Sequence, residues 1–205
     1  MTDRQESARV SEVAPLEPGV PSATLAQFLS LLFARASAEL IDLGPAVGAN
    51  IAFLGERIGC KIHVVDLYAD LDHHARHDAL AQFPDCVEQR FALPDESVDA
   101  VLCWDVFDFL DPPAAGVLAR QLKRVLRRGG PVLGLFSGGG QDEQYYAKYV
   151  IEDETRLRRS FYPGACPRGH VRQNREINAL FTGLELIGSV LLKSGVREVL
   201  FRKPI

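Results

Sequence analysis

Hydrophobic positions along the chain change between helical spacing and short continuous apolar runs, and this change predicts a succession of helices and strands. Residues 23–38 carry apolar side chains at helical spacing, and Ser22 precedes them as a potential N-cap. A short apolar run at 39–43 follows, typical of a buried strand. A glycine-containing turn at 44–48 then leads into a second helix, which Gly59 is expected to end.

The same switching continues to the end of the chain. Further strands are expected at 61–65, 87–91, 98–104, 131–136, 184–192 and 197–202, and further helices at 71–83, 113–126 and 174–181. Strands that are apolar on both faces and alternate with helices indicate a parallel sheet covered by helices. Only a short turn separates the last two strands, so they must pair antiparallel. The predicted fold is a Rossmann-like, doubly wound α/β domain with a mostly parallel seven-stranded sheet, an antiparallel C-terminal strand and helices on both faces.

The domain organisation follows from length and local composition. At 205 residues the chain suits one domain, expected at 22–205. Residues 1–21 are rich in Glu, Ser, Pro and Ala and lack an apolar run, so we expect a flexible leader. The segment 141–171 is rich in Tyr and Arg and less regular, so we expect it to form a mobile cover over the substrate side, hinged at the Ser-Gly run 137–140.

Charge and cysteine usage narrow the class of protein. The net charge of −4 and the pI near 5.7 argue against a nucleic-acid partner. Four cysteines without a Cys-x-x-Cys pair indicate reduced thiols. No apolar run is long enough for a bilayer, so we expect a cytoplasmic protein without a membrane partner. Nothing in the sequence indicates an oligomeric state.

Two motifs lie where strands are expected to end. In the run Asp42-Leu43-Gly44-Pro45-Ala46-Val47-Gly48, Gly44 lets a ligand approach the backbone and Gly48 lets the helix start close to the strand. The alternative is a tight turn without a ligand. Asp66 ends the second strand 22 positions after Gly44, where a carboxylate accepts hydrogen bonds from ribose hydroxyls. The alternative there is an acidic helix cap.

Taken in order, these motifs resemble the class I S-adenosylmethionine-dependent methyltransferases. The resemblance continues at 93–102 (LPDESVDAVL), at 122–130 (LKRVLRRGG) and at 175–186, and it covers about 39–202. It implies S-adenosylmethionine as the cofactor and a small-molecule acceptor.

The resemblance also implies roles for individual residues. It places Asp42, Gly44, Pro45 and Gly48 around the methionine part of the cofactor, Asp66 at the ribose, Leu67, Ala92 and Leu93 at the adenine, and Cys103, Trp104 and Asp105 toward the methyl group and the substrate. Asp105 is the candidate general base, and Asp108 lies in the same loop. The alternative for both acids is a solvated cap of the next helix.

Two departures from the family pattern leave a second function open. Ala46 replaces the middle glycine of the loop, and Gln89 stands near the position where many members carry an acid after the third strand. The alternative is therefore a catalytically degenerate domain that acts as a cofactor-binding or interaction module. A short-chain oxidoreductase is excluded, because its Tyr-x-x-x-Lys pair is missing: Gln144 precedes Lys148 by four residues.

Two polar clusters have competing interpretations. The Tyr/Arg-rich segment comprises Tyr145, Tyr146, Tyr149, Arg156, Arg158, Arg159, Tyr162, His170 and Arg172. Its arginines either clamp an anionic group of the substrate or form a solvated face. His73, His74 and His77, with Asp70 and Asp72, resemble metal ligands, but the segment offers no distant third ligand, so no metal site is expected.

Overall fold

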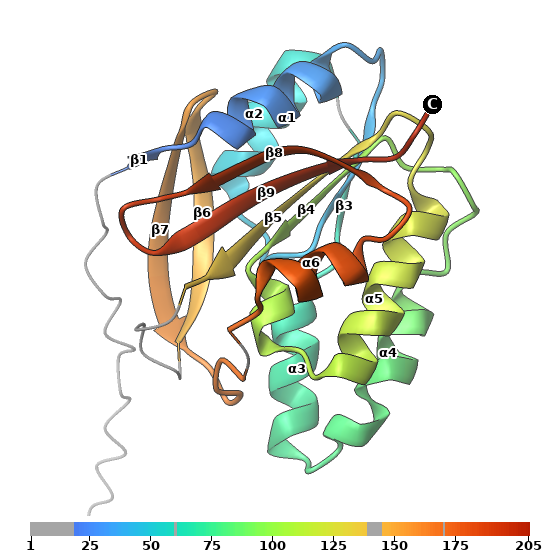
Figure 1. The fold of residues 1–205 in the computed structure, drawn as a ribbon, viewed down its shortest axis with the longest axis vertical. Helices are drawn as coiled ribbons and strands as arrows, with labels where there is room; N and C mark the ends of the chain where they lie inside the picture. Colours follow the sequence, from blue (N-terminus) through green and yellow to red (C-terminus); the bar gives the residue numbers. More distant parts are fainter. Residues whose placement is uncertain (1–18, 60, 139–144, 170) are drawn as a thin grey trace, which may run out of the picture.

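A six-stranded sheet forms the centre of the computed structural model of the protein, which describes residues 19–59, 61–138, 145–169 and 171–205 (Figure 1). In spatial order, the strands are β3 (Lys61–Val64), β2 (Glu39–Asp42), β4 (Ala100–Trp104), β5 (Pro131–Ser137), β9 (Val196–Arg202) and β8 (Glu185–Leu191). The first four are parallel, and β9 pairs antiparallel with both β5 and β8. The Rossmann-like α/β fold and its antiparallel C-terminal pair are therefore confirmed.

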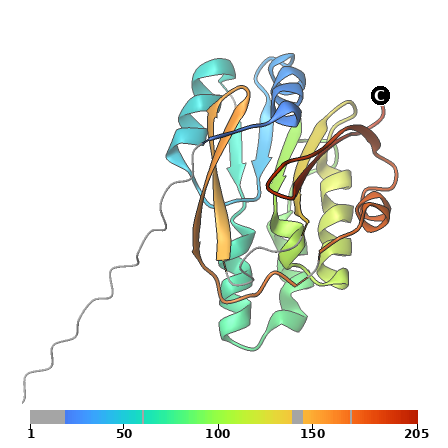
Figure 2. The same cartoon turned by 60° about the vertical axis from the view of Figure 1, so that its left-hand side comes forward.

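Helices cover both faces of this sheet (Figures 1 and 2). They are α1 (Ala23–Phe33), α2 (Gly48–Ile58), α3 (Leu67–Arg76), α4 (Phe83–Arg90), α5 (Pro112–Val125) and α6 (Asn174–Leu180), with 3-10 turns η1 (Leu80–Gln82) and η2 (Val106–Phe109). Alternate residues of β4 face opposite hydrophobic clusters, Leu102 toward α1 and Cys103 toward α5. Each face of the sheet therefore has its own apolar core.

The ends of several helices follow local sequence signals. Ser22 Oγ accepts a hydrogen bond from Leu25 N at 3.1 Å and caps α1, as predicted. Gly59 follows α2 in the left-handed conformation at φ 58°, which a glycine adopts without strain. Asp111 caps α5 by accepting from Ala114 N at 2.9 Å. The α1 helix ends at Phe33, earlier than expected.

The prediction of a strand at 87–91 is wrong, because residues 87–90 belong to α4 and Phe91 follows its end. The sheet therefore has six strands, not the seven predicted. Phe83, Val87 and Phe91 recur every four residues, and all three are buried in the core, which is the spacing of one helix face. As a result β3 lies at the edge of the sheet.

A second, three-stranded sheet lies beside the carboxyl ends of β4 and β5 (Figure 2). Its strands are β6 (Tyr145–Asp153), β7 (Arg156–Pro163) and β1 (Val20–Pro21), all antiparallel. The segment expected to be less regular is therefore largely a β-hairpin. The end of the expected leader forms β1, whereas residues 1–18, the hinge positions 139–140 and residues 141–144 lie outside the described residues.

Asn50 fastens this hairpin to the start of α2. Its Nδ2 donates to Tyr149 O at 2.9 Å, and its Oδ1 accepts from Ile151 N at 2.8 Å. Asn50 is 2% exposed, so both hydrogen bonds are shielded from water. The hairpin is therefore a packed part of the domain in this conformation.

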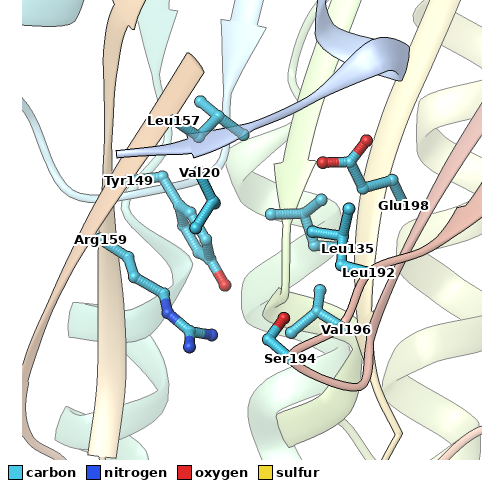
Figure 3. Close-up of a pocket in the computed structure, with 9 residues that line it drawn as sticks. All are labelled: Val20, Leu135, Tyr149, Leu157, Arg159, Leu192, Ser194, Val196 and Glu198. Carbon is cyan, nitrogen blue, oxygen red and sulfur yellow. The ribbon is translucent and has the colours of Figure 1, made fainter. Parts of the chain in front are cut away.

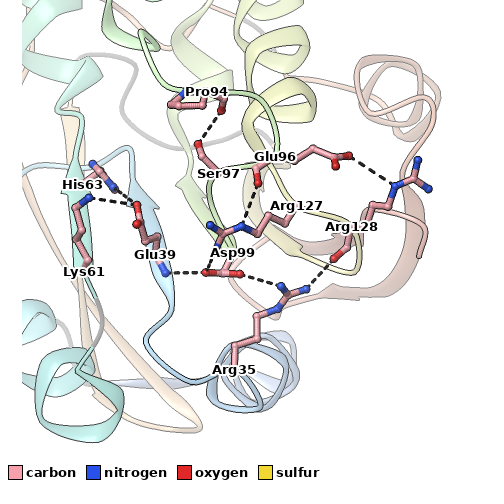
Figure 4. Close-up of polar contacts among 10 residues, drawn as sticks. All are labelled: Arg35, Glu39, Lys61, His63, Pro94, Glu96, Ser97, Asp99, Arg127 and Arg128. Carbon is pink, nitrogen blue, oxygen red and sulfur yellow. Dashed lines mark hydrogen bonds and ion pairs between the residues drawn. The ribbon is translucent and has the colours of Figure 1, made fainter.

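An ion-pair network closes the amino edge of the sheet (Figure 4). The Asp99 carboxylate accepts from Arg35 at 2.8 Å, from Arg127 at 2.7 Å and from Glu39 N at 2.9 Å. Burial alone raises the pKa of Asp99, but these hydrogen bonds outweigh it and lower the pKa overall. The network joins the end of α1, β2 and the turn before β5 on the side opposite the candidate site.

Candidate functional site

The carboxyl edge of the sheet brings the predicted site motifs together. The chain passes from β2 to β3 on one side and returns to β4 on the other, so the loops after β2 and β4 diverge at a topological switch point. The 43–48 loop follows β2, Asp66 follows β3, and Asp105 follows β4. Ligands of open α/β sheets bind at such a point.

A cleft opens beside Asp66 at this edge, which we call the Asp66 cleft. It is lined by Pro45, Asp66, Tyr68, Ala69, Asp72, Tyr146, Lys148, Tyr162 and Pro163. Asp66 caps α3 by accepting from Ala69 N at 3.0 Å. Its carboxylate is half-buried and lines the cleft, so the cap and a ligand-binding role are compatible.

Trp104 covers the glycine loop. The backbone of Trp104 is left-handed (φ 50°), and its Nε1 donates to Asp42 Oδ1 at 2.6 Å. A Cβ atom added to Gly44 would lie 2.7 Å from Trp104 Cδ1, so the indole fills the space that this glycine leaves. Burial raises the pKa of Asp42 to about 6, although the hydrogen bonds from Gly44 N and Trp104 oppose the shift.

Tyr149 of the hairpin stacks on this indole and separates it from a second hollow. The two ring centroids are 5.1 Å apart, with an interplanar angle of 7°. The hollow, which we call the Glu198 groove, is lined by Val20, Leu135, Tyr149, Leu157, Arg159, Leu192, Ser194, Val196 and Glu198 (Figure 3). Glu198 Oε2 accepts from Thr24 Oγ1 at 2.5 Å, and most of the other lining residues are aliphatic.

Asp105 and Asp108 lie at the centre of a buried polar cluster. Asp105 accepts from Tyr68 Oη at 2.5 Å and from Arg168 Nη2 at 2.6 Å. Asp108 Oδ2 accepts from Arg168 Nη1 at 3.1 Å and from Ser137 N at 2.7 Å. Burial, reinforced by the charge of Asp105, raises the pKa of Asp108 to about 8. The alternative that these acids are solvated helix caps is wrong, because they are 1% and 0% exposed and Asp105 makes no side-chain cap bond.

Comparison with solved structures shows a shared fold at low sequence identity. The PH0226 protein of Pyrococcus horikoshii is 17% identical, with 88% of each chain covered and a TM-score of 0.52. The 1,6-didemethyltoxoflavin-N1-methyltransferase of Burkholderia thailandensis, solved with 1,6-didemethyltoxoflavin and S-adenosylhomocysteine, is 17% identical over 89% of this chain and 79% of that chain, at a TM-score of 0.50. The [4+2]-cyclase SpnF is 13% identical over 89% and 80% of the two chains, at 0.52.

Sequence comparison relates part of the chain to one family. Residues 41–134, a little under half of the chain, match the methyltransferase domain family. The match spans the glycine loop, β3, β4 and part of β5. This part of the chain is therefore similar to that family. Among curated proteins, no sequence matches it significantly.

The structure brings some of the predicted site residues together. Asp42, Gly44 and Trp104 are in contact, and Pro45 and Asp66 line one cleft. Each of these roles toward the cofactor stays a prediction.

Other predicted site residues lie elsewhere. Leu67 and Cys103 are fully buried in the apolar core, where burial strongly raises the pKa of the Cys103 thiol. Ala92 and Leu93 lie beside the end of α5, where Arg124 donates to Leu93 O at 2.8 Å. A Cβ atom at Gly48 would meet nothing within 4 Å, so close packing of helix on strand does not explain this glycine.

Three residues at the candidate site carry no recognisable signal in the sequence. Tyr68 follows Asp66 by two positions in a helix, Asn50 lies in the first turn of α2, and Arg168 belongs to the segment between β7 and α6. Arg172, for which the sequence leaves an anion clamp and a solvated face open, is buried and donates to the Phe107 and Leu110 carbonyls at 3.0 and 2.6 Å.

The cofactor implied by the methyltransferase family fits one half of this site. Two carboxylates, Asp66 and Asp72, and three tyrosines line the Asp66 cleft and suit a nucleoside. The space beside Gly44, where the methionine half is expected, is filled by the Trp104 indole and backed by Tyr149. The methionine half therefore does not fit without movement of these rings.

Two further observations bear on the expectations for metal and membrane. The described residues contain no group of three or more His, Cys, Asp or Glu arranged to hold a metal ion. The His73 and His77 rings instead lie against each other, with centroids 4.4 Å apart. None of the helices in the described part of the chain has the length and apolar character to cross a membrane.

Proposed function

We propose that this domain binds S-adenosylmethionine with its adenosine end in the Asp66 cleft and transfers the methyl group to a small-molecule acceptor. The observation that carries this proposal is the half-buried Asp66 carboxylate at the switch point, in a cleft that Pro45 and three tyrosines also line. A carboxylate accepts hydrogen bonds from both ribose hydroxyls, and tyrosine rings pack on a purine. The cofactor supplies an electrophilic methyl group on its sulfonium.

The residues of this chain have distinct parts in the proposed site. Asp66 holds and orients the ribose, and Asp42 fixes the glycine loop through Gly44 N at 2.9 Å. The Glu198 groove lies on the other side of Tyr149 and offers an apolar approach for the acceptor (Figure 3). Full occupancy requires the Trp104 and Tyr149 rings to move.

The Asp66→Asn variant tests the proposal by calorimetric titration with S-adenosylmethionine and S-adenosylhomocysteine. Asparagine keeps an oxygen to cap α3 but removes the charge, so both ligands should bind at least about 10-fold more weakly. Asp111→Asn is the matched control, because Asp111 caps α5 in the same way but does not line the Asp66 cleft. Unchanged affinity in Asp66→Asn would place the ribose elsewhere.

A second candidate function is a domain without transferase activity that binds a ligand or partner. The filled space beside Gly44 and the Asn50 anchor of the hairpin favour it. The similarity in fold to a [4+2]-cyclase is compatible with chemistry other than methyl transfer. Conversion of S-adenosylmethionine to S-adenosylhomocysteine by the unaltered protein would overturn this candidate, whereas binding without turnover is compatible with it. Binding that is acquired only in Trp104→Ala would support it.

A further inference from the structure

The Glu198 groove places an acidic side chain against an apolar core. Val196 and Leu200 of β9 are buried in the apolar cluster that includes α1, and Glu198 lies between them on the same face of the strand. Glu198 itself is 1% exposed. Fully buried glutamates are rare in proteins unless they have a partner. The position of Glu198 therefore calls for one.

The Glu198 carboxylate has no cation opposite it in the described part of the chain. Thr24 N and Thr24 Oγ1 both donate to Oε2, at 3.4 and 2.5 Å, and no other described residue bonds to this side chain. Thr24 lies in the first turn of α1, so the helix N-terminus offsets part of the negative charge. Oε1 remains open to the groove, which Glu198 lines. Because charges in protein interiors are as a rule paired, this oxygen points to a cationic ligand.

The rest of the Glu198 groove suits a small apolar group. Its aliphatic lining residues are Val20, Leu135, Leu157, Leu192 and Val196. The groove has about 370 Å³ of empty space, part of which is open to solvent. Arg159 lies on the wall opposite Glu198, with aliphatic side chains between them (Figure 3). A cation in the groove is therefore repelled from one wall and attracted to the other.

The hydrogen bonds of Glu198 favour an ammonium group over other cations. A guanidinium binds a carboxylate best through two parallel hydrogen bonds, which need both oxygens. Oε2 already accepts from Thr24, so one oxygen is left for a ligand. A metal ion needs several ligands, and the described residues contain no group of three or more His, Cys, Asp or Glu that could hold one. An ammonium group is a compact charge that a single oxygen suits.

We propose that the Glu198 groove binds a small apolar primary amine, with its ammonium group on Glu198 and its hydrocarbon part against the aliphatic walls. The site is separate from the Asp66 cleft, because none of the lining residues belongs to both. Tyr149 of the groove stacks on Trp104, which covers Gly44. That such an amine is the methyl acceptor rests on the proposed function, whereas its binding does not require the cofactor.

Chemical-shift titration of the unaltered protein with butylamine, at neutral pH and without cofactor, tests this inference. Butanol has nearly the same shape without a charge, and butyrate carries the opposite charge. Butylamine should bind at least about 10-fold more tightly than butanol, because only the ammonium group gains a charge-assisted hydrogen bond, and butyrate should bind most weakly. The amides of Ser194 and Val196 should shift, whereas that of Ala69, in the Asp66 cleft, should not. Equal affinities for butylamine and butanol, or shifts centred on Ala69, would overturn the inference.

The Glu198→Gln variant separates binding of a ligand from support of α1. Glutamine keeps an oxygen for Thr24 but removes the charge, so butylamine should bind at least about 10-fold more weakly and butanol as before. Glu185→Gln is the matched control, because Glu185 is an exposed acid on the neighbouring β8 and does not line the groove. Unchanged butylamine affinity in Glu198→Gln would mean that Glu198 only supports α1, and would overturn the inference. If this variant does not fold, the comparison of butylamine with butanol on the unaltered protein still decides.

The outcomes also separate this inference from the proposed function. Absence of butylamine binding would overturn the inference and leave the Asp66 cleft, which is tested by titration with the cofactor, unaffected. Butylamine binding at the groove by a protein that binds neither S-adenosylmethionine nor S-adenosylhomocysteine would overturn the proposed function. The groove would then remain an amine site, and the amine would not be a methyl acceptor.

Discussion

At the scale of single residues, Gly44 leaves space both for a ligand, as the sequence indicates, and for the Trp104 indole. The sequence identifies Gly44 as part of a ligand-binding loop, and the structure gives it a second partner in the indole. Only a residue without a side chain lets Trp104 reach Asp42, which then holds the indole nitrogen. The glycine is therefore needed in the ligand-free domain as well.

Replacing Gly44 with alanine should destabilise the protein by about 1–3 kcal/mol, because the added methyl group overpacks the contact with Trp104. Gly48→Ala is the matched control. Its Cβ meets nothing within 4 Å, and it lies at the start of α2, so alanine should be neutral or stabilising by up to about 1 kcal/mol. Urea unfolding of both variants measures the difference. Equal stability of the two would remove Trp104 as the reason for the glycine.

The residue scale is also where sequence reasoning reaches its limit. Asp42, Gly44 and Asp66 are recognisable because each lies at a strand end within a known spacing. Arg168 is not recognisable in the sequence. It lies 63 positions after Asp105, in a loop whose sequence shows no periodic pattern. Which side chains share a buried charge depends on tertiary packing that local patterns do not encode.

At the scale of elements, the hairpin of β6 and β7 determines how closed the site is. Ala147, Ile151 and Leu157 are buried in the same apolar cluster as α1. Asn50 adds two buried hydrogen bonds from α2 to the backbone of β6. The predicted mobile cover is thus ordered at 145–163, and whether it moves on ligand binding stays a prediction.

Asn50→Ala should lower the free energy of unfolding by about 2–4 kcal/mol, because it leaves Tyr149 O and Ile151 N buried without partners. Asn50→Asp should destabilise the fold at least as much, since it keeps the acceptor for Ile151 N but sets a buried carboxylate oxygen against Tyr149 O. Asn178→Ala, at an exposed position of α6, should change stability by less than about 0.5 kcal/mol. Chemical denaturation of the three variants gives the values. A negligible effect of Asn50→Ala would mean that the apolar contacts alone hold the hairpin.

Element prediction from the sequence fails at 87–91, where the run is too short to establish a spacing by itself. Val87 and Phe91 enclose three polar residues and show no alternation, whereas Phe83, Val87 and Phe91 repeat every four residues like a helix. The helix forms because this repeat buries three large side chains on one face, and Pro84 suits the first turn of a helix.

At the scale of the whole molecule, the charged groups at the two edges of the sheet differ in how deeply they are buried. The amino edge is an open network in which Asp99 meets Arg35 and Arg127, both partly exposed. The carboxyl edge holds Asp105 and Asp108 around a buried guanidinium, and two polar atoms of this cluster have no hydrogen-bond partner among the described residues. Stability is expected to depend on the first edge and ligand binding on the second.

Asp99→Asn should destabilise the fold by about 1–3 kcal/mol at neutral pH, because it weakens three hydrogen bonds to a charged acceptor. Asp95→Asn is the control, since its carboxylate is 73% exposed and pairs with Arg124 on the surface. Against the effect of burial, the hydrogen bonds from Glu39 N and Arg127 hold the folded pKa of Asp99 below its ordinary value of 3.8, so its contribution to stability is present above that value and is lost as pH falls through the folded pKa. The gap between Asp99→Asn and the unaltered protein should therefore close in acid, measured by unfolding across pH. A gap independent of pH would mean that the charge is not responsible.

The distant origin of Arg168 has a consequence for how the protein is made. Synthesis proceeds from the N-terminus, so β2, β3, β4 and β5 leave the ribosome before the hairpin and before Arg168. Until then, Asp105 and Asp108 lack the cation that they enclose in the finished domain. The parallel half of the sheet therefore cannot complete its polar centre until residue 168 has been synthesised. Its last step is the arrival of a loop encoded more than sixty codons after Asp105.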